Sequence, residues 1–179
     1  MTLHRKLSAA LATLFLIASA PAAQAELISL PDTEISALGT SDNQCWNVRR
    51  KERGFTRKIN NDRGLRGIGR VKLDPELSKA ARVHTYSMAR KDRLYHTPSN
   101  TLRNRVTNWT VLGENVGYGN TVRSLHDAFM NSPDHRDNIL YGTFRHVGIG
   151  TVNRNGRLWV TVIFEAVSDP GTTLPMPRC

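Results

Sequence analysis

Three side chains in this sequence are of types that bind metal ions or transfer protons: His96, Glu114 and His135. Glu114 stands in the stretch GENVG, where glycines on both sides allow other backbone to approach closely. Ser132 is expected to cap a short helix, and His135 follows Pro133 in the first turn of that helix. Two imidazoles and one carboxylate form a minimal set for a catalytic zinc ion, with Glu114 as a ligand or as the general base on zinc-bound water.

The spacing of these residues gives the metal hypothesis little support. No local helical motif joins them, and the chain has no HExxH, GxSxG, P-loop or GxGxxG motif. Glu114 has an alternative role as a turn residue whose carboxylate accepts nearby backbone N–H groups. For His135, the helix dipole disfavours the charged ring whereas Asp134 favours it, so the sequence leaves the sign of its pKa shift open. No catalytic residue is assigned.

The other histidines have mainly structural interpretations. His84 lies on the apolar face of an expected helix, which predicts a buried, hydrogen-bonded core residue. His126 is expected to be structural or exposed. His146 begins an expected strand, and the sequence does not decide which way it points.

The clearest helix is expected from about Pro75 to Asp92. Asp74 is a favourable N-cap, Pro75 suits the first helical position, and apolar residues recur at helical spacing. The other expected helices cover residues 55–62, residues near Val122 to Phe129, and 133–140. Residues 95–109 are expected to form a loop.

The apolar stretches HVGIGTV and RLWVTVIFEAV predict two strands joined by a turn at Asn153–Gly156, and residues 110–120 begin in a strand-like way. Helices followed by strands indicate an α+β domain.

The first 25 residues have the features of a cleaved signal peptide. Arg5 and Lys6 precede a short apolar run, and Ala23-Gln24-Ala25 fits a cleavage site. The run is too short for a comfortable membrane span, so an uncleaved anchor is the less favoured alternative. We expect a secreted protein, or a periplasmic one in a double-membrane bacterium, with no transmembrane anchor. Residues 26–44 are expected to form a poorly ordered linker before a single domain over 45–179.

The chain has two cysteines, Cys45 and Cys179. In an oxidising compartment they predict one disulfide that joins the two ends of the domain. Free thiols and a dimer through Cys179 are the alternatives, although we expect a monomer.

Positive charge is concentrated in one segment. From Arg49 to Lys72 the chain has ten Lys/Arg residues against two acids, a net charge of +8. The segment predicts either a solvated helix face or adhesion to anionic polymers. Export and the lack of interleaved aromatic residues argue against a nucleic-acid partner.

Five short stretches, in this order, resemble the bacterial branch of the CAP superfamily, the SCP-like extracellular domains related to cysteine-rich secretory proteins, venom antigens and plant pathogenesis-related proteins. The resemblance covers residues 55–167 and is carried by the stretches LDPELSKAARVHTYSMA, YHTPSN, LGENVGYG, FMNSPDHRDNIL and HVGIGTV…LWVTVIFEA. It implies a three-layer α-β-α sandwich with a central antiparallel sheet and a large cleft, which in some members holds zinc or another divalent cation.

Residue by residue, the resemblance places His96, Glu114 and His135 in that cleft. The chain departs from the eukaryotic pattern, because no glutamate stands near residues 133–135 and the second eukaryotic histidine falls near Thr143 instead of at His146. The resemblance therefore implies a binding module for an apolar ligand, including lipids, for an envelope component or for a partner protein. A metal-dependent hydrolase using His96, Glu114 and His135, and adhesion through residues 49–72, are the alternatives.

Overall fold

The computed structural model describes residues 47–167. The expected signal peptide (1–25), the expected linker (26–44) and both cysteines, Cys45 and Cys179, lie outside the described residues. The cleavage, the linker and the disulfide stay predictions.

The described residues form five helices and four strands, joined by short connections. The helices are α2 (Arg50–Gly64), α3 (Pro75–Lys91), α4 (Ser99–Arg105), α5 (Val122–Asn131) and α6 (Pro133–Leu140). The strands are β1 (Lys72–Leu73), β2 (Val111–Gly119), β3 (His146–Arg154) and β4 (Arg157–Ala166).

The four strands form one sheet in the order β1-β3-β4-β2. The long strands β2, β4 and β3 are antiparallel neighbours, whereas the two-residue β1 pairs with β3 in parallel. In this sheet β2 lies at one edge. The central antiparallel sheet expected from the sequence is confirmed, with β1 as a short parallel addition.

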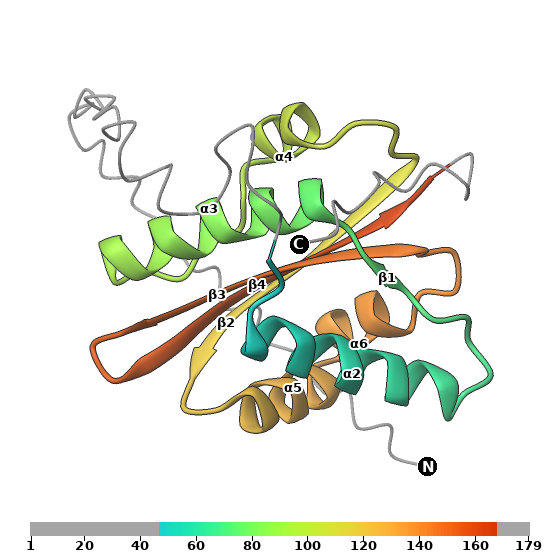
Figure 1. Ribbon diagram of the computed structural model, residues 1–179, viewed down its shortest axis with the longest axis horizontal. Helices are drawn as coiled ribbons and strands as arrows, with labels where there is room; N and C mark the ends of the chain where they lie inside the picture. The colour runs from blue at the N-terminus through green and yellow to red at the C-terminus, as the bar shows by residue number, and fades with distance from the viewer. Residues whose placement is uncertain (1–46, 168–179) are drawn as a thin grey trace, which may run out of the picture.

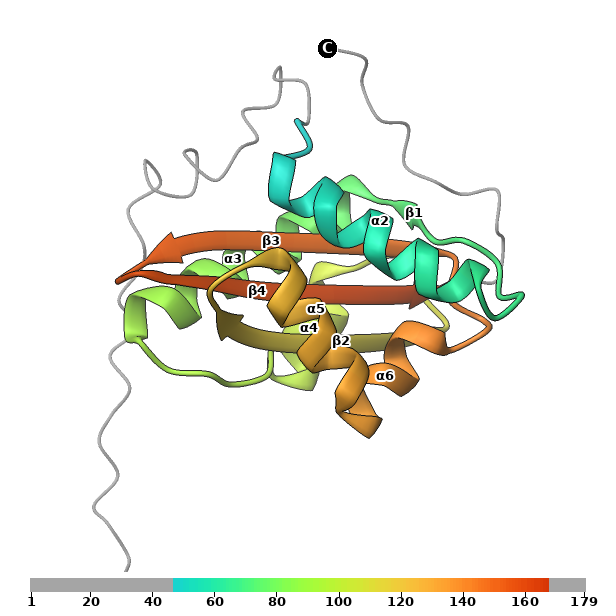
Figure 2. The same cartoon turned by 90° about the horizontal axis from the view of Figure 1, so that it is seen from below.

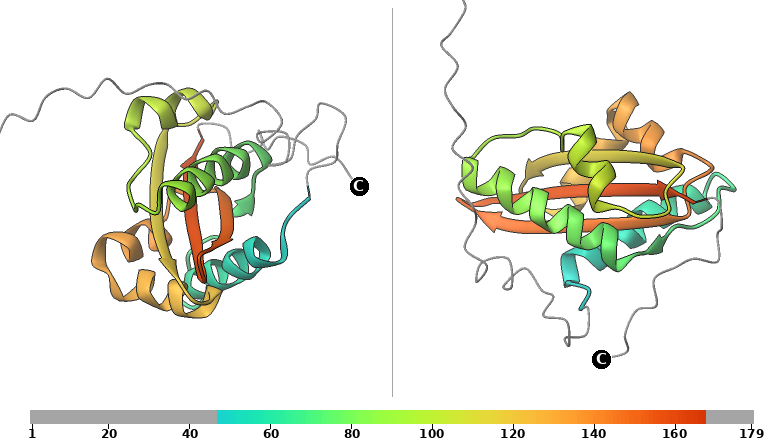
Figure 3. Two further views of the ribbon diagram at one scale, coloured as in Figure 1. Left: turned by 90° about the vertical axis from the view of Figure 1, so that its left-hand side faces the viewer. Right: turned by 90° about the horizontal axis from the view of Figure 1, so that it is seen from above.

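Helices cover both faces of the sheet and make three layers (Figures 1 and 2). Helices α3 and α4 lie on one face, and α2, α5 and α6 lie on the other, as the end-on view in Figure 3 shows. Strand β4 serves both layers, because successive side chains of a strand point to opposite faces. Ile163 packs with Leu77 of α3, while Val162 and Phe164 join the core under α2 and α5.

The backbone of α3 lies directly on β3. A Cβ atom added at Gly148 would meet the backbone carbon of Leu77 at 2.1 Å, and one added at Gly150 would meet that of Ala81 at 2.4 Å. The start of α3 is as expected, because the Asp74 carboxylate accepts a hydrogen bond of 2.9 Å from the Leu77 N–H. These contacts fix the helix that leads to His96.

Two expectations about helices are wrong. The expected helix at 55–62 begins earlier, at Arg50, and passes through Gly54, which lies beside Val122 of α5. The expected loop at 95–109 contains α4, whose Leu102 packs against α3 and so stabilises a short helix without a strong local signal.

Candidate functional site at the edge of the sheet

The candidate residues gather around the edge strand β2, whose side chains alternate between the two helical layers. Val116 packs beside Met88 of α3, so Glu114, two residues earlier, lies on the same face. Asn115 points to the opposite face, where its side-chain amide donates to the His135 backbone carbonyl at 2.9 Å.

Hydrogen bonds occupy both carboxylate oxygens of Glu114. Oε1 accepts from the Thr97 N–H at 2.9 Å and lies 2.9 Å from Nδ1 of His96, and Oε2 accepts from the Thr97 hydroxyl at 2.5 Å. The Glu114 side chain is only 6% exposed, whereas that of His96 is 62% exposed. Glu114 thus ties the loop after α3 to the edge strand, and His96 stands at the surface.

The buried His84 of α3 contacts the same loop. His84 of α3 has its Nε2 2.7 Å from the Tyr95 carbonyl oxygen, and its ring meets the Tyr95 ring edge-on at 4.9 Å. Burial lowers the pKa of His84, so the neutral ring is favoured. The expectation of a hydrogen-bonded core histidine is confirmed, and His84 positions the residue next to His96.

His135 approaches the edge strand from the other layer. Its ring lies 5.0 Å from that of Phe129, and its Nδ1 lies 2.9 Å from the Ser132 hydroxyl. Ser132 occupies the N-cap position of α6, but its side chain bonds to this ring and makes no cap hydrogen bond, contrary to the expected cap. Burial, and secondly the charge of His96, lower the pKa of His135 more than Asp134 raises it.

Sequence reasoning missed the amide pair that holds α6 to β2. Nδ2 of Asn138 donates to Oδ1 of Asn115 at 2.9 Å and approaches the Glu114 carbonyl at 3.3 Å. Asn115 is fully buried. A buried amide needs such partners. The asparagines in the stretches GENVG and DNIL were therefore the sequence features that could have indicated this contact between β2 and α6.

A pocket of about 320 Å³ lies between α4 and β2. Leu102, Trp109 and Leu112 supply its apolar lining. His96, Glu114 and Arg103 supply polar groups, and the guanidinium of Arg103 lies 5.8 Å from the centre of the Trp109 ring. The volume lies at the lower end of the range for small-molecule sites.

The structure brings His96 to Glu114 and packs the His135 ring against Phe129 and Ser132 of the other layer, still near enough to His96 for the charge of His96 to lower the pKa of His135. In residues 47–167 no three or more His, Cys, Asp or Glu side chains are grouped to hold a metal ion. His126 and His146 are both buried, at 2% and 1% exposure, and lie apart from the pocket lining. The zinc site remains a hypothesis without a three-ligand group among the described residues.

None of the described helices is long and apolar enough to cross a membrane.

Comparison with known proteins identifies the domain type. Residues 56–164 match the cysteine-rich secretory protein family (CAP). The chain is also 30% identical over 115 residues to the Bacillus subtilis protein YkwD, an alignment that covers 60% of this chain and 44% of YkwD. The chain therefore spans less than half of that curated relative.

Three solved structures share the fold at low sequence identity. An outer surface protein of Borrelia burgdorferi is 14% identical with a TM-score of 0.63, covering 70% of this chain and 98% of that one. A cysteine-rich secretory protein of Staphylococcus aureus is 24% identical with a TM-score of 0.56, covering 70% and 40%. An extracellular SCP-domain protein of Bacillus anthracis is 18% identical with a TM-score of 0.55, covering 68% and 45%.

Proposed function

This chain belongs to the cysteine-rich secretory protein family, and we propose that it is a binding module whose ligand occupies the pocket between α4 and β2. The ligand is a small amphiphile with an apolar body and an anionic head group. Its body contacts Leu102, Trp109 and Leu112, and its head group lies near Arg103. In keeping with the secretory family, we propose that the protein acts outside the cytoplasm.

The three contacts of the Glu114 carboxylate with Thr97 and His96 carry the preference for binding over catalysis. A general base needs a lone pair directed at the proton that it removes. Both oxygens of Glu114 instead accept hydrogen bonds from Thr97, and one also faces His96. Glu114 therefore holds the pocket wall in place, and a change at this residue alters the pocket through Thr97.

Dodecanoate is a suitable probe, with dodecanol as its uncharged counterpart. We expect dodecanoate to bind with one-to-one stoichiometry in titration calorimetry below its micelle concentration, and to change the fluorescence of Trp109. Arg103→Gln should weaken dodecanoate binding about three- to tenfold and leave dodecanol binding unchanged, because a partly exposed ion pair contributes about 1 kcal/mol. Arg90→Gln, an exposed position on α3, is the matched control.

Two results would overturn this proposal. One is dodecanoate binding that is equally weakened by Arg103→Gln and Arg90→Gln, or unaffected by both. The other is one tightly bound zinc ion per chain, lost in His96→Ala, together with ester hydrolysis that depends on the metal. That second result would establish the hydrolase alternative.

A further inference from the structure

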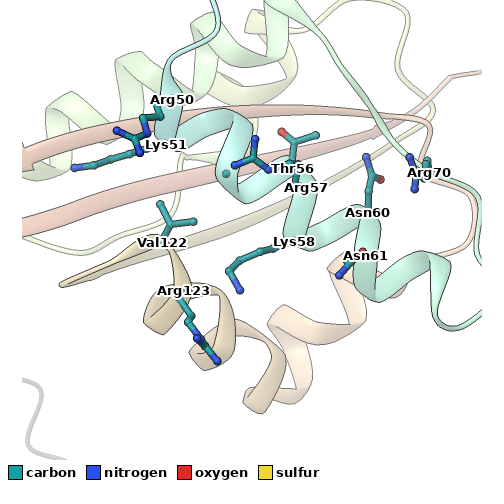
Figure 4. Close-up of a pocket in the computed structure, with 11 residues that line it drawn as sticks. Arg50, Lys51, Thr56, Arg57, Lys58, Asn60, Asn61, Arg70, Val122 and Arg123 are labelled. Atoms are coloured by element: carbon teal, nitrogen blue, oxygen red, sulfur yellow. The ribbon is translucent and has the colours of Figure 1, made fainter.

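The basic segment found in the sequence does not form one uniform charged face. Some of its members already have partners within the protein: Arg63 is fully buried, Arg49 donates to the Thr151 carbonyl, and the exposed Arg66 pairs with Asp62. Five others line a hollow of about 860 Å³ between α2 and α5, where Arg123 joins them (Figure 4). The six cations are Arg50, Lys51, Arg57, Lys58, Arg70 and Arg123.

The acids of the same segment are turned away from this hollow. Glu52 is fully buried and both its oxygens are held by Arg82. Asp62 is bound to Nε2 of His126 at 2.6 Å and to Arg66 at 3.3 Å. Within residues 47–167 no aspartate or glutamate lines the hollow, so no carboxylate inside it offsets its positive charge.

Most of the six cations are available to a ligand. Arg50, Arg57, Lys58 and Arg70 make no hydrogen bond or salt bridge to another side chain or carbonyl of the described residues. Lys51 donates to the exposed Asn153 side chain, and the Arg123–Asp127 pair spans 3.9 Å between exposed groups. Exposed contacts of this kind are weak and readily exchanged.

The walls of the hollow are held in place by the core. At one end Gly54 of α2 lies beside Val122 of α5, and farther along the Asp62–His126 contact joins the same two helices. Asn60 fixes the loop beside Arg70, because its side chain makes two hydrogen bonds of 2.9 Å with the Val71 backbone. The backbone positions that carry the cations are therefore fixed, which lowers the entropy cost of binding.

From this arrangement we propose that the hollow between α2 and α5 binds a linear anionic polysaccharide, at a site separate from the α4–β2 pocket. Guanidinium groups donate in pairs to sulfate, phosphate or carboxylate groups, and several lie along the hollow. The exposed side-chain amide of Asn61 can donate to and accept from sugar hydroxyls. A concave surface accommodates a chain-like ligand along its length.

The shape and lining argue against two other polyanions. A lipid bilayer is flat on this scale. Among residues 47–167 only Val122 adds an apolar side chain to the lining, which gives this part of the chain little to insert among acyl chains. A single-stranded nucleic acid is bound by aromatic side chains that stack on its bases. None lines this hollow among the described residues.

The test uses heparin, a linear sulfated polysaccharide, with the whole protein. We expect binding at about 0.15 M salt that weakens steeply as salt rises, because ligand binding releases condensed counterions. Arg57→Gln with Lys58→Gln should reduce affinity at least about tenfold and lower the slope of log K against log salt by about two. Glutamine retains the helix propensity of both residues.

The matched control is Lys79→Gln with Arg90→Gln. It makes the same change in net charge on exposed positions of α3, on the other side of the sheet, and should leave heparin affinity nearly unchanged. Arg70→Gln with Arg123→Gln is a second, independent pair in the hollow. This second pair should also reduce heparin affinity, and it tests the proposal even if the first pair unfolds α2. Circular dichroism will show whether each variant is folded.

Two outcomes would overturn the proposal. Equal losses in the hollow and control variants would mean that heparin responds to net charge alone. Tighter binding of phosphatidylglycerol vesicles or single-stranded DNA than of heparin, at the same charge concentration, would assign the hollow to a membrane or a nucleic acid. A loss confined to the two hollow variants, with heparin preferred, supports it.

Discussion

The guanidinium of Arg82 donates two hydrogen bonds to the carboxylate of Glu52, from Nε to Oε1 at 2.8 Å and from a terminal nitrogen to Oε2 at 2.6 Å. The pair is buried, at 3% and 0% exposure, and it joins α3 to α2, helices on opposite faces of the sheet. Glu52 also accepts from the Arg49 N–H at the start of α2. One carboxylate thus links the two outer layers and fixes the helix that carries the cationic hollow.

Removal of one partner of this pair should be strongly destabilising. Arg82→Met leaves a buried carboxylate without its cation and should lower the free energy of unfolding by about 3–5 kcal/mol in urea titrations. Glu52→Gln with Arg82→Met should recover part of that loss, since no buried charge remains. Single and double variants of equal stability would contradict this explanation.

Substitution of Arg63 should lower the stability of the fold strongly, whereas substitution of its exposed basic neighbours should not. Its guanidinium donates to the carbonyl oxygens of Gly69, Ile139, Tyr141 and Phe144 at 2.7, 2.8, 2.9 and 3.1 Å, respectively. Arg63→Lys should cost at least about 3 kcal/mol, because an ammonium group cannot reach all four acceptors.

The exposed Arg57→Lys is the matched control for Arg63→Lys, and it should change stability by less than about 0.5 kcal/mol. Chemical denaturation of both variants checks the prediction. A similar effect at the two positions would show that the carbonyl contacts contribute little.

Close contact between β3 and α3 predicts a second sensitive position. Gly148→Ala places a Cβ atom within 2.1 Å of the Leu77 backbone, so α3 must move away from the sheet. We expect a loss of about 3 kcal/mol or an unfolded protein. Gly142→Ala should be nearly neutral, because a Cβ atom added there would meet no other part of the protein within 4 Å. Thermal unfolding of the two variants gives the comparison.

Glu165 should make stability fall as the pH rises. Burial, and secondly the charges of Asp74 and Glu76, raise the pKa of Glu165 to about 7 from 4.5. Its folded-state pKa lies above the unfolded one, so its contribution is fully present below about pH 4.5 and is lost as the pH rises through 7. The loss amounts to about 3 kcal/mol.

Glu165→Gln isolates that effect. The buried His146, whose Nδ1 lies 3.7 Å from the Glu165 carboxylate, has a pKa lowered chiefly by burial, and its contribution changes with pH in the opposite sense. Urea titrations between about pH 5 and 8 should show the variant gaining stability relative to the wild type as pH rises. Parallel profiles would mean that Glu165 is ionised in the folded protein well below pH 7. Asp127→Asn, at an exposed position, is the control.

Local sequence determined the elements that carry their own signals. Asp74 and Pro75 start α3 by capping and by a preset backbone angle, and the apolar stretches on either side of Asn155-Gly156 produce β3 and β4. The ordered motifs also indicated the family and the three-layer fold. Such signals depend on neighbours within a few positions, so no tertiary contact was needed to recognise them.

Only the tertiary structure decided which side chains meet. Glu114 and Asn115 are adjacent in sequence but face opposite layers, and this separates Glu114 from the layer of His135. Arg63 looks like its basic neighbours, yet three of its carbonyl partners lie 76–81 positions along the chain, so no local pattern reveals its burial. The cationic hollow likewise exists because α5 brings Arg123 beside α2. Contacts between distant segments are set by packing across the sheet, and a single sequence does not contain that geometry in any local pattern.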